Sequence, residues 1–309
     1  MSAPRQEVHI TEVGPRDGLQ NEKTIVDLET KIRFVESLAA SGLRSIEVTS
    51  FVSPKWVPQL ADAEALLRGI KRTSGVSYSA LVPNEQGLER ALAVGVDAIA
   101  VFTAASETFA QRNINATIAQ SVAKFAPVAQ RAKAAGIRVR GYVSCVIACP
   151  FEGAVQPIAV RDVARMLLDI GVDEIDLGDT IGVALPHDIE RLYAGLHDTL
   201  APEATVLHLH DTRGTAIACA SKALELGVRH FDGSVGGLGG CPYAPGASGN
   251  VATEELVTLV EQCGYSTGVS VAQLCAAGRM IAAALGRSLP SRVLAAESCQ
   301  RADGAAESR

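Results

Sequence analysis

The stretch TVLHLHDTRG, Thr205 to Gly214, passes from a run of apolar and β-branched residues into a polar loop. A helix pattern follows from Thr215 to Leu226 and is closed by Gly227, and the short β-rich run RHFDGSV comes next. Glycine commonly follows the last residue of a helix because it adopts positive φ without steric cost. Strand, loop, helix and strand in this order predict a βαβ unit, whose parallel strands need a helical crossover.

The same alternation recurs along the chain. We read strands at 8–13, 45–51, 76–82, 97–102, 137–144, 174–179, 205–210 and 229–235, and helices at 28–40, 85–94, 118–135, 160–170, 187–199, 215–226 and 253–262. Eight such units without a compositional break favour a closed (β/α)₈ barrel. An open dinucleotide-binding sheet would carry a GxGxxG loop after its first strand, and this chain has none there.

A further helix pattern covers 269–285, after the eighth unit. We therefore predict an α/β fold, a single (β/α)₈ TIM barrel with an extra C-terminal helix. The predicted catalytic domain covers residues 1–298. The small and polar residues 299–309 are expected to form a disordered tail.

Composition restricts the class of protein. With 309 residues and 48% hydrophobic content the chain can bury a large core. A net charge of -6 without a dense Lys/Arg run argues against nucleic acid as a partner. No apolar run approaches the length of about 20 residues that a membrane helix needs. The 7 cysteines form no CxxC pair, and Met1–Glu7 has no signal-peptide character, so we expect a cytoplasmic protein with reduced thiols.

His208 and His210 lie two residues apart in a predicted strand, so their rings point to the same side. Such a pair is more often hydrogen-bonded than metal-bound, and its partners decide between these alternatives. The carboxyl ends of barrel strands open on one face. Other polar residues predicted at that face are Arg16, Asp17, Glu47, Thr49, Asp179 and those of the loop GGLGGCPYAPGASGN.

Two imidazoles, the carboxylate of Asp17 and the amide oxygen of Asn250 would form a mixed nitrogen and oxygen ligand set. Such a set leaves positions open for water or substrate, whereas structural zinc is closed by Cys and His. We therefore predict a catalytic divalent metal cation, Mg²⁺ or Mn²⁺. The alternative for Asp17 is a loop or helix-capping carboxylate.

Several motifs together resemble the 3-hydroxy-3-methylglutaryl-CoA lyase family (HMG-CoA lyases), within the DRE-TIM metallolyase superfamily. The motifs are EVGPRDGLQNEK, TSFVSPKWVPQ, RGYVSC, CPFEG, LGDTIG, HLHDTRG and GGLGGCPYAPGASGNVATE. The resemblance extends from about Val8 to about Gly286. It implies a (β/α)₈ barrel with a bound divalent metal that splits the hydroxyacyl-CoA into acetyl-CoA and acetoacetate, as in leucine degradation and ketone-body formation.

The resemblance also implies roles for individual residues. The metal ligands or near ligands would be Asp17, His208, His210 and Asn250. The catalytic residues would be Arg16, Asp179, Cys241 and His208. Of the residues that we expect to bind substrate, Arg16, Glu47 and Glu254 match site residues of the family. Our own expectation adds Gln20, Asn21 and Lys23 as neighbours of the acyl end.

The chemistry of C2–C3 cleavage requires loss of the C3 hydroxyl proton and stabilisation of the thioester enolate. Arg16 can donate a charge-assisted hydrogen bond to the enolate oxygen. Asp179 is our first candidate for the base and one of the histidines the second. The glycine-rich loop from Gly236 to Gly249 predicts a lid that carries Cys241. The alternatives are a phosphate-gripping turn, or barrel closure around a buried thiol.

Two other functions stay open at this point. The enzyme could act on another 3-hydroxy-3-alkylglutaryl-CoA or 3-hydroxyacyl-CoA, because the sequence does not reveal the pocket for the C3 substituent. The chain could also be a catalytically silent metal- or acyl-CoA-binding barrel, although binding alone requires neither Arg16 nor Cys241. We expect a small-molecule acyl-CoA partner and a homo-oligomer, dimeric or higher.

Overall fold

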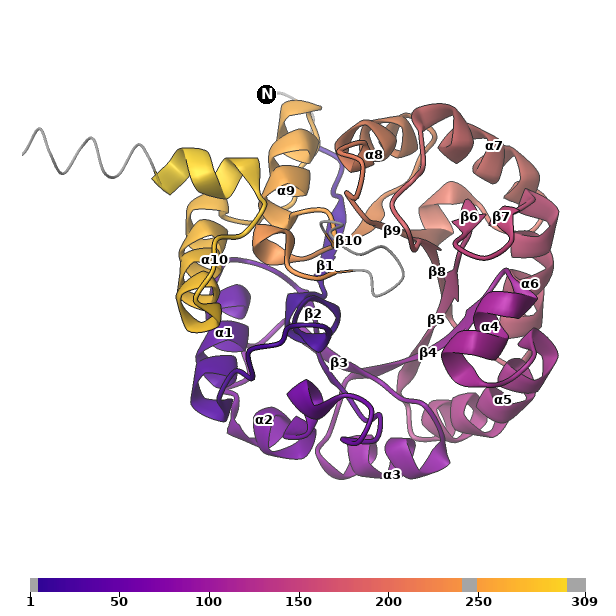
Figure 1. The fold of residues 1–309 in the computed structure, drawn as a ribbon, viewed down its shortest axis with the longest axis horizontal. Helices are drawn as coiled ribbons and strands as arrows, with labels where there is room; N and C mark the ends of the chain where they lie inside the picture. The colour runs from indigo at the N-terminus through magenta and orange to yellow at the C-terminus, as the bar shows by residue number, and fades with distance from the viewer. Residues whose placement is uncertain (1–4, 241–248, 299–309) are drawn as a thin grey trace, which may run out of the picture.

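Eight parallel strands of the described chain close into a barrel, which confirms the predicted fold class (Figure 1). The computed structural model describes residues 5–240 and 249–298. Around the barrel the strand order is β1-β10-β9-β8-β5-β4-β3-β2. The strands are β1 His9–Glu12, β2 Ser45–Ser50, β3 Ser77–Leu81, β4 Ala98–Ala104, β5 Arg138–Ser144, β8 Glu174–Asp179, β9 Thr205–Leu209 and β10 His230–Gly233.

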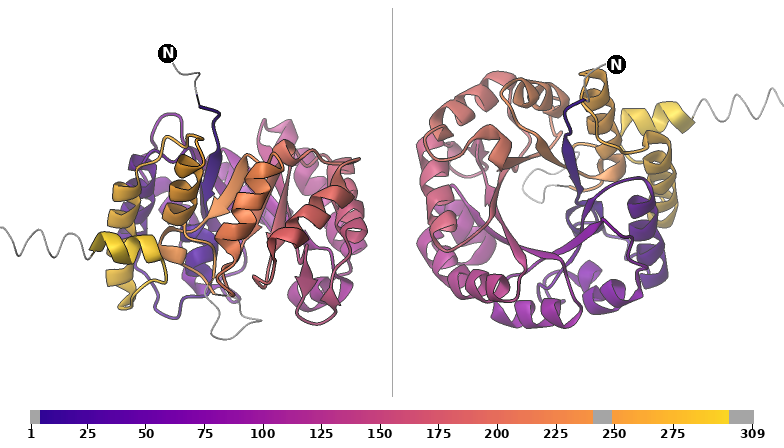
Figure 2. Two further views of the ribbon diagram at one scale, coloured as in Figure 1. Left: turned by 90° about the horizontal axis from the view of Figure 1, so that it is seen from above. Right: turned by 180° about the vertical axis from the view of Figure 1, so that it is seen from behind.

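Helices form a ring outside the strands, and Figure 2 shows this ring from the side and from the opposite end. The helices are α1 Leu28–Ala40, α2 Ala63–Gly69, α3 Glu85–Ala93, α4 Glu107–Ile114, α5 Ile118–Ala134, α6 Pro157–Asp169, α7 Pro186–Leu196, α8 Ala216–Glu225, α9 Thr253–Gln262 and α10 Val271–Leu285. The predicted extra helix corresponds to α10, which packs against α1 and α9 in the outer ring. No helix in the described ranges has the length and apolar character needed to span a lipid bilayer.

Short elements account for most differences from the sequence-based assignment. We did not predict α2, α4, the hairpin of β6 Ala148–Cys149 with β7 Gly153–Ala154, or the helical residues 292–298. Helices of only about two turns give a weak hydrophobic periodicity. Two longer helices, α6 and α7, begin earlier than predicted because each starts at a proline, which suits the first helical position.

The apolar core lies between the barrel and the helices, whereas the barrel interior is polar. Alternate strand residues such as Ile175, Leu177 and Phe231 belong to the hydrophobic core. Their neighbours Asp176 and Asp232 are buried polar residues and point the other way, because successive strand side chains alternate between faces. Polar groups are therefore concentrated inside the barrel, where they must form hydrogen bonds and ion pairs with one another.

The loop after β1 is a π-helical turn, η1 Gly14–Gly18, in which the amide of Gly18 donates to Val13 O at 3.1 Å. This turn packs against a 3₁₀ turn, η4 Val235–Gly237, so closely that a Cβ at Gly18 would lie 2.7 Å from Ser234 Oγ. The remaining 3₁₀ turns are η2 Pro58–Leu60 and η3 Pro202–Ala204. Turns of the π type often occur at functional sites.

Glu12, the last residue of β1, connects these two turns. Its Oε1 accepts from the amides of Gly14 at 2.8 Å and Val235 at 2.9 Å. Its Oε2 accepts from Thr253 Oγ1 at 2.6 Å. Because Glu12 is fully buried, its donors have no access to water and depend on this carboxylate.

We expect Glu12→Ala to lower the free energy of unfolding by at least about 2 kcal/mol, since two buried amides would lose their acceptor. Glu12→Gln is the matched control, because it keeps an oxygen for the amides of Gly14 and Val235. Urea denaturation measures both variants. Equal stability of Glu12→Ala and the wild type would contradict the role of Glu12.

Candidate functional site

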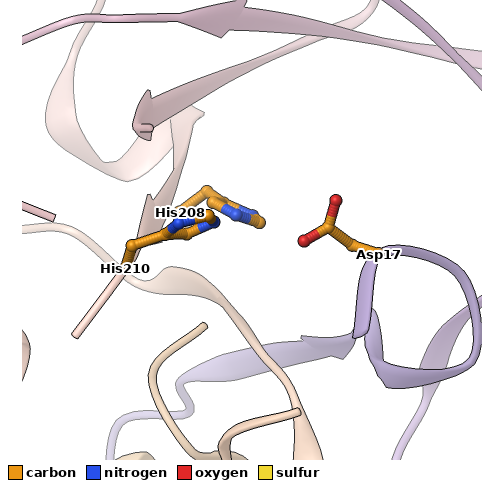
Figure 3. A group of neighbouring side chains, drawn as sticks. All are labelled: Asp17, His208 and His210. Atoms are coloured by element: carbon orange, nitrogen blue, oxygen red, sulfur yellow. The ribbon is translucent and has the colours of Figure 1, made fainter. Parts of the chain in front are cut away.

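Asp17, His208 and His210 converge at the carboxyl-terminal mouth of the barrel (Figure 3). Asp17 comes from the η1 turn, His208 from β9, and His210 from the residue after β9 ends. One possible ligand atom of each residue lies within 4.8 Å of those of the other two. The predicted convergence of the two imidazoles with a carboxylate is present in the structure.

Asn250 lies beside this group, because it forms an isolated antiparallel bridge with His210. Its Nδ2 donates to Asp17 Oδ2 at 2.8 Å and to Leu238 O at 3.1 Å. Both partners can only accept, so the amide nitrogen must face them. The amide oxygen of Asn250 is then the atom available for a metal ion.

The electrostatics favour deprotonated ligands at two of the three positions. Burial alone would raise the pKa of Asp17, but the charges of Arg16 and the two histidines lower that pKa to about 2. Burial and the neighbouring His208 lower the pKa of His210 to about 4. For His208, burial lowers the pKa, but the hydrogen bond and charge of Asp232 outweigh it, and the pKa is raised above its ordinary value.

These residues fit a divalent cation. The Nδ1 atom of His210 is buried and has no hydrogen-bond partner among the described residues. Such an atom is costly to bury unless a ligand satisfies it. The mixed oxygen and imidazole set suits Mg²⁺ or Mn²⁺ better than structural zinc. Asp17, His208, His210 and the oxygen of Asn250 could therefore hold a metal.

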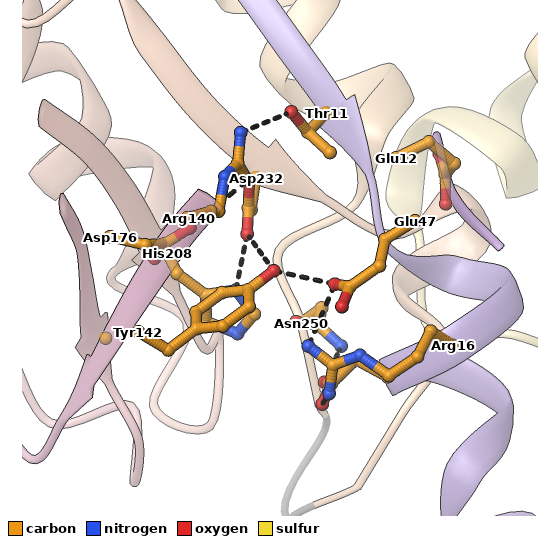
Figure 4. A network of polar contacts seen from close by, with 12 residues as sticks. Thr11, Glu12, Arg16, Glu47, Arg140, Tyr142, Asp176, His208, Asp232 and Asn250 are labelled. Carbon is orange, nitrogen blue, oxygen red and sulfur yellow. Dashed lines mark hydrogen bonds and ion pairs between the residues drawn. The ribbon is translucent and has the colours of Figure 1, made fainter. Parts of the chain in front are cut away.

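A second acidic group lies deeper in the barrel, where ligand atoms of Asp176, His208 and Asp232 also come within 4.8 Å of one another. Here the positive charge is already supplied by Arg140. Its Nη1 lies 2.9 Å from Asp232 Oδ1 and 3.3 Å from Asp176 Oδ2 (Figure 4). Asp232 Oδ2 is 3.1 Å from His208 Nδ1, which orients this imidazole as carboxylates commonly orient metal-binding histidines.

Arg16 is held at the edge of the metal-binding group. Its Nη1 donates to Asp17 Oδ1 at 2.6 Å, and its Nη2 donates to Glu47 Oε2 at 3.0 Å. The hydroxyl of Tyr142 donates to the same Glu47 oxygen at 2.6 Å, and the Arg16 guanidinium lies 5.3 Å from the centre of the Tyr142 ring. Figure 4 shows these groups together. Two carboxylates and the face of the Tyr142 ring thus hold the guanidinium in place.

A cavity of about 710 Å³ opens over these groups. Polar residues that line it include Arg16, Asp17, Gln20, Asn21, Tyr142, His208 and His210. Its volume is typical of sites for small organic ligands and cofactors. The two predicted substrate-binding residues Gln20 and Asn21 therefore face the same cavity as the metal-binding group.

Other predicted site residues lie elsewhere. Asp179 follows the inward-facing Gly178, so it points outward, where its Oδ2 accepts from the amide of Ala184 at 2.9 Å. Burial raises the pKa of Asp179 to about 6. It does not line the cavity, and this placement argues against our first candidate for the base.

Glu254 is buried in the first turn of α9, where both carboxylate oxygens accept from the amide of Gly236 at 3.0 Å. Glu254 and the exposed Lys23 do not line the cavity, and Glu47 lies behind Arg16 rather than at the surface of the cavity. The structure therefore does not bring Glu254 or Lys23 to the predicted substrate site. Cys241 lies outside the described residues.

Sequence reasoning missed Arg140, Tyr142 and Asp232, which complete the polar interior. A signal for them was present. In the strand RVRGYVS, Arg140 and Tyr142 share one face, and in FDG the aspartate alternates with the core residue Phe231.

The chain resembles known lyases over nearly its whole length. The HMGL-like family model matches residues 7–281. The hydroxymethylglutaryl-CoA lyase of Pseudomonas mevalonii is 52% identical over 287 residues, which cover 93% of this chain and 95% of that protein. The structure of hydroxymethylglutaryl-CoA lyase from Pseudomonas aeruginosa has a TM-score of 0.94 and 48% identity, covering 97% of this chain and 100% of that one. The HMG-CoA lyase from Acinetobacter baumannii, solved in complex with coenzyme A and 3-methylmalate, has a TM-score of 0.89 and 37% identity, covering 95% and 96%.

We expect Mn²⁺ affinity to fall on acidification from above to below the raised pKa of His208, because a proton on His208 excludes a cation from the same imidazole. The raised pKa of His208 places this loss at higher pH than the lowered pKa values of Asp17 and His210 would. Below the pKa of His208 each pH unit should cost about tenfold in affinity. Calorimetric titrations at several pH values measure the Mn²⁺ affinity. An affinity that does not change with pH over this range would contradict the assignment of His208 as a metal ligand.

Proposed function

Because this chain belongs to the HMGL-like family, we propose that it is a metal-dependent carbon–carbon lyase that cleaves 3-hydroxy-3-methylglutaryl-CoA to acetyl-CoA and acetoacetate. The observation that supports this most directly is the presence of Asp17, His208 and His210 beside Arg16 in one cavity. The relative from Pseudomonas mevalonii, at 52% identity, is named as such a lyase. A silent binding barrel would not require an immobilised guanidinium at this position.

We assign metal binding to Asp17, His208, His210 and the amide oxygen of Asn250, with Mg²⁺ or Mn²⁺ as the ion. When bound, such an ion acts as a Lewis acid that acidifies a hydroxyl group and orients a chelating substrate. The hydrogen bond from Asn250 to Asp17 keeps this carboxylate turned toward the two imidazoles. The hydrogen bond between His208 and Asp232 fixes which ring nitrogen faces the cavity.

Arg16 stabilises the negative charge that develops on the thioester oxygen when the C2–C3 bond breaks. Two carboxylates and the Tyr142 ring hold its guanidinium in place, so little reorganisation is needed during the reaction. Arg16 is buried at 6% relative exposure, and a charge in such a site interacts more strongly than in water.

The C3 hydroxyl proton needs an acceptor, and we propose His208, the second of our two candidates. His208 lines the cavity, whereas Asp179 does not. The carboxylate of Asp232 accepts from His208 Nδ1 and stabilises the protonated imidazole. Because Nδ1 of His208 faces Asp232, its other ring nitrogen would hold either the metal or this proton, so as the base it would leave Asp17, His210 and the amide oxygen of Asn250 to hold the metal. The role of Cys241 stays a prediction from the sequence.

We further propose that the protein forms a homo-oligomer, acts in leucine degradation and is located in the cytoplasm. Curated relatives include proteins named mitochondrial and one named cytoplasmic. The extent of the catalytic domain over residues 1–298 is likewise proposed.

A coupled assay for acetoacetate tests the proposed function. We expect the purified protein to cleave 3-hydroxy-3-methylglutaryl-CoA with Mg²⁺ or Mn²⁺, to lose activity on chelation, and to regain it when the metal is restored. A panel of 3-hydroxyacyl-CoA esters tests the alternatives. Cleavage of only longer-chain esters would favour the related lyase, and no cleavage of any ester with metal present would favour a silent barrel.

We expect Arg16→Lys to reduce kcat by about 10²- to 10³-fold, because lysine keeps the charge but loses the planar fork that contacts Asp17 and Glu47. The control is Arg44→Lys, because Arg44 is an exposed arginine that does not line the cavity. Steady-state kinetics with saturating metal measure both variants. A kcat within a few-fold of the wild type would refute the role of Arg16.

A further inference from the structure

A second cavity, of about 420 Å³, lies at the amino-terminal end of the barrel, opposite the mouth that carries the metal-binding group. Its lining includes Ser45, Ser77, Ala98 and Arg138, each of which is the first residue of its strand. The interior of a (β/α)₈ barrel is ordinarily filled by bulky side chains, which leave no such space. The volume is within the range of sites for small organic ligands, about 300–1,000 Å³.

The space arises because three adjacent strands, β2, β3 and β4, line it with small side chains. These are Ser45, Ser77, Ser79, Ala98 and Ala100. The next strand, β5, lines the cavity with the much larger Arg138, Arg140 and Tyr142. One part of the wall therefore consists of hydroxyl and methyl groups, and another part carries guanidinium groups.

Tyr142 separates this cavity from the active-site cavity, because it lines both. Its hydroxyl donates to Glu47, and beside it Arg140 is paired with Asp176 and Asp232 (Figure 4). These buried side chains close the inner end of the amino-terminal cavity. The residues of the metal-binding group line the active-site cavity alone. A ligand in the amino-terminal cavity would therefore be remote from the reacting groups.

Arg138 brings a positive charge to this cavity and keeps its N–H donors available. Its Nη2 lies 3.8 Å from Glu174 Oε1, which is beyond hydrogen-bond distance. Glu174 is already engaged, because its Oε2 accepts from Arg140 Nε at 2.8 Å and its Oε1 lies 3.1 Å from His230 Nδ1. Within the described ranges, the guanidinium of Arg138 therefore has no hydrogen-bonded acceptor.

Two serine hydroxyls extend this set of donors. Ser45 and Ser77 are register partners on β2 and β3, so their side chains lie next to each other. Among the residues that the structure describes, neither hydroxyl has a hydrogen-bond partner, although both residues line the cavity. Arg44, at the same rim, is instead paired with Glu7 at 2.7 Å. The donors available in the cavity therefore suit a ligand that presents acceptor oxygens.

We propose that the amino-terminal cavity binds a small anion that carries a carboxylate or a phosphate group. Arg138 binds two oxygens of this group through its planar fork, a geometry that suits carboxylates and phosphates alike. Ser45 and Ser77 donate to the remaining oxygen acceptors. The site is independent of the proposed lyase function, because none of the residues assigned to the metal lines it.

Calorimetric titrations with succinate and with inorganic phosphate test the proposal and distinguish the two kinds of anion. We expect the wild type to bind at least one of them. Arg138→Ala should lower the affinity by about tenfold, because a charge-assisted interaction is lost, and Arg138→Lys should restore part of the loss. Ala98→Leu should also lower the affinity by about tenfold, because it keeps every donor but fills part of the cavity.

Two controls locate the bound anion. Arg131→Ala removes another exposed arginine, which pairs with Glu85 and Glu89 and lines neither cavity, so the affinity should not change. Mg²⁺ should also leave the affinity unchanged, because the metal-binding group lies at the opposite end of the barrel. Urea denaturation checks that each variant is folded. If Ala98→Leu does not fold, the two Arg138 variants decide, because the side chain of Arg138 is 71% exposed.

The proposal would be overturned if the wild type bound neither anion up to about 10 mM. It would also be overturned if Arg138→Ala bound the anion as tightly as the wild type. An affinity that requires Mg²⁺ would place the anion at the metal-binding group instead, and would equally contradict a site at the amino-terminal end.

Discussion

The position of Arg16 between two carboxylates is the constraint on which the site depends. Asp17 is at once its ion-pair partner and a candidate metal ligand, and Glu47 holds the other end of the guanidinium. Arg16 therefore has two effects. It places a positive charge where the enolate would form, and it orients the Asp17 carboxylate that would bind the metal. The π-helical turn makes this possible, because it presents adjacent residues, Arg16 and Asp17, to the same cavity.

The polar barrel interior supports this arrangement. Barrels of this class are usually filled with bulky apolar side chains, whereas here Arg140, Asp176 and Asp232 occupy the interior. Such a buried network adds little net stability, because each charge loses its hydration. The network instead orients His208, through the hydrogen bond between Asp232 and the His208 ring. The apolar layer between strands and helices supplies the stability.

The strand–helix alternation and the closing glycines were enough to predict the barrel, and the end-of-strand rule brought Asp17 together with His208 and His210. The end-of-strand rule fails for Asp179. A position at the end of a strand does not determine whether the side chain points into the barrel or out toward the helices. In EIDLGD the side chains alternate, and Asp179 falls on the outward face. Glu254 could not be placed because its contact, Gly236, belongs to a turn without periodicity.

The central claim is that Asp17, His208 and His210 hold a divalent metal beside Arg16. The most direct measurement is electron spin echo modulation of Mn²⁺ bound to the protein, which detects nitrogen nuclei of coordinated imidazoles. Our account predicts ¹⁴N modulation in the wild type and its reduction in His210→Ala, with His230→Ala unchanged because His230 lies at the other end of the barrel interior. Tightly bound Mn²⁺ without nitrogen coupling, or the same coupling in His210→Ala, would contradict it.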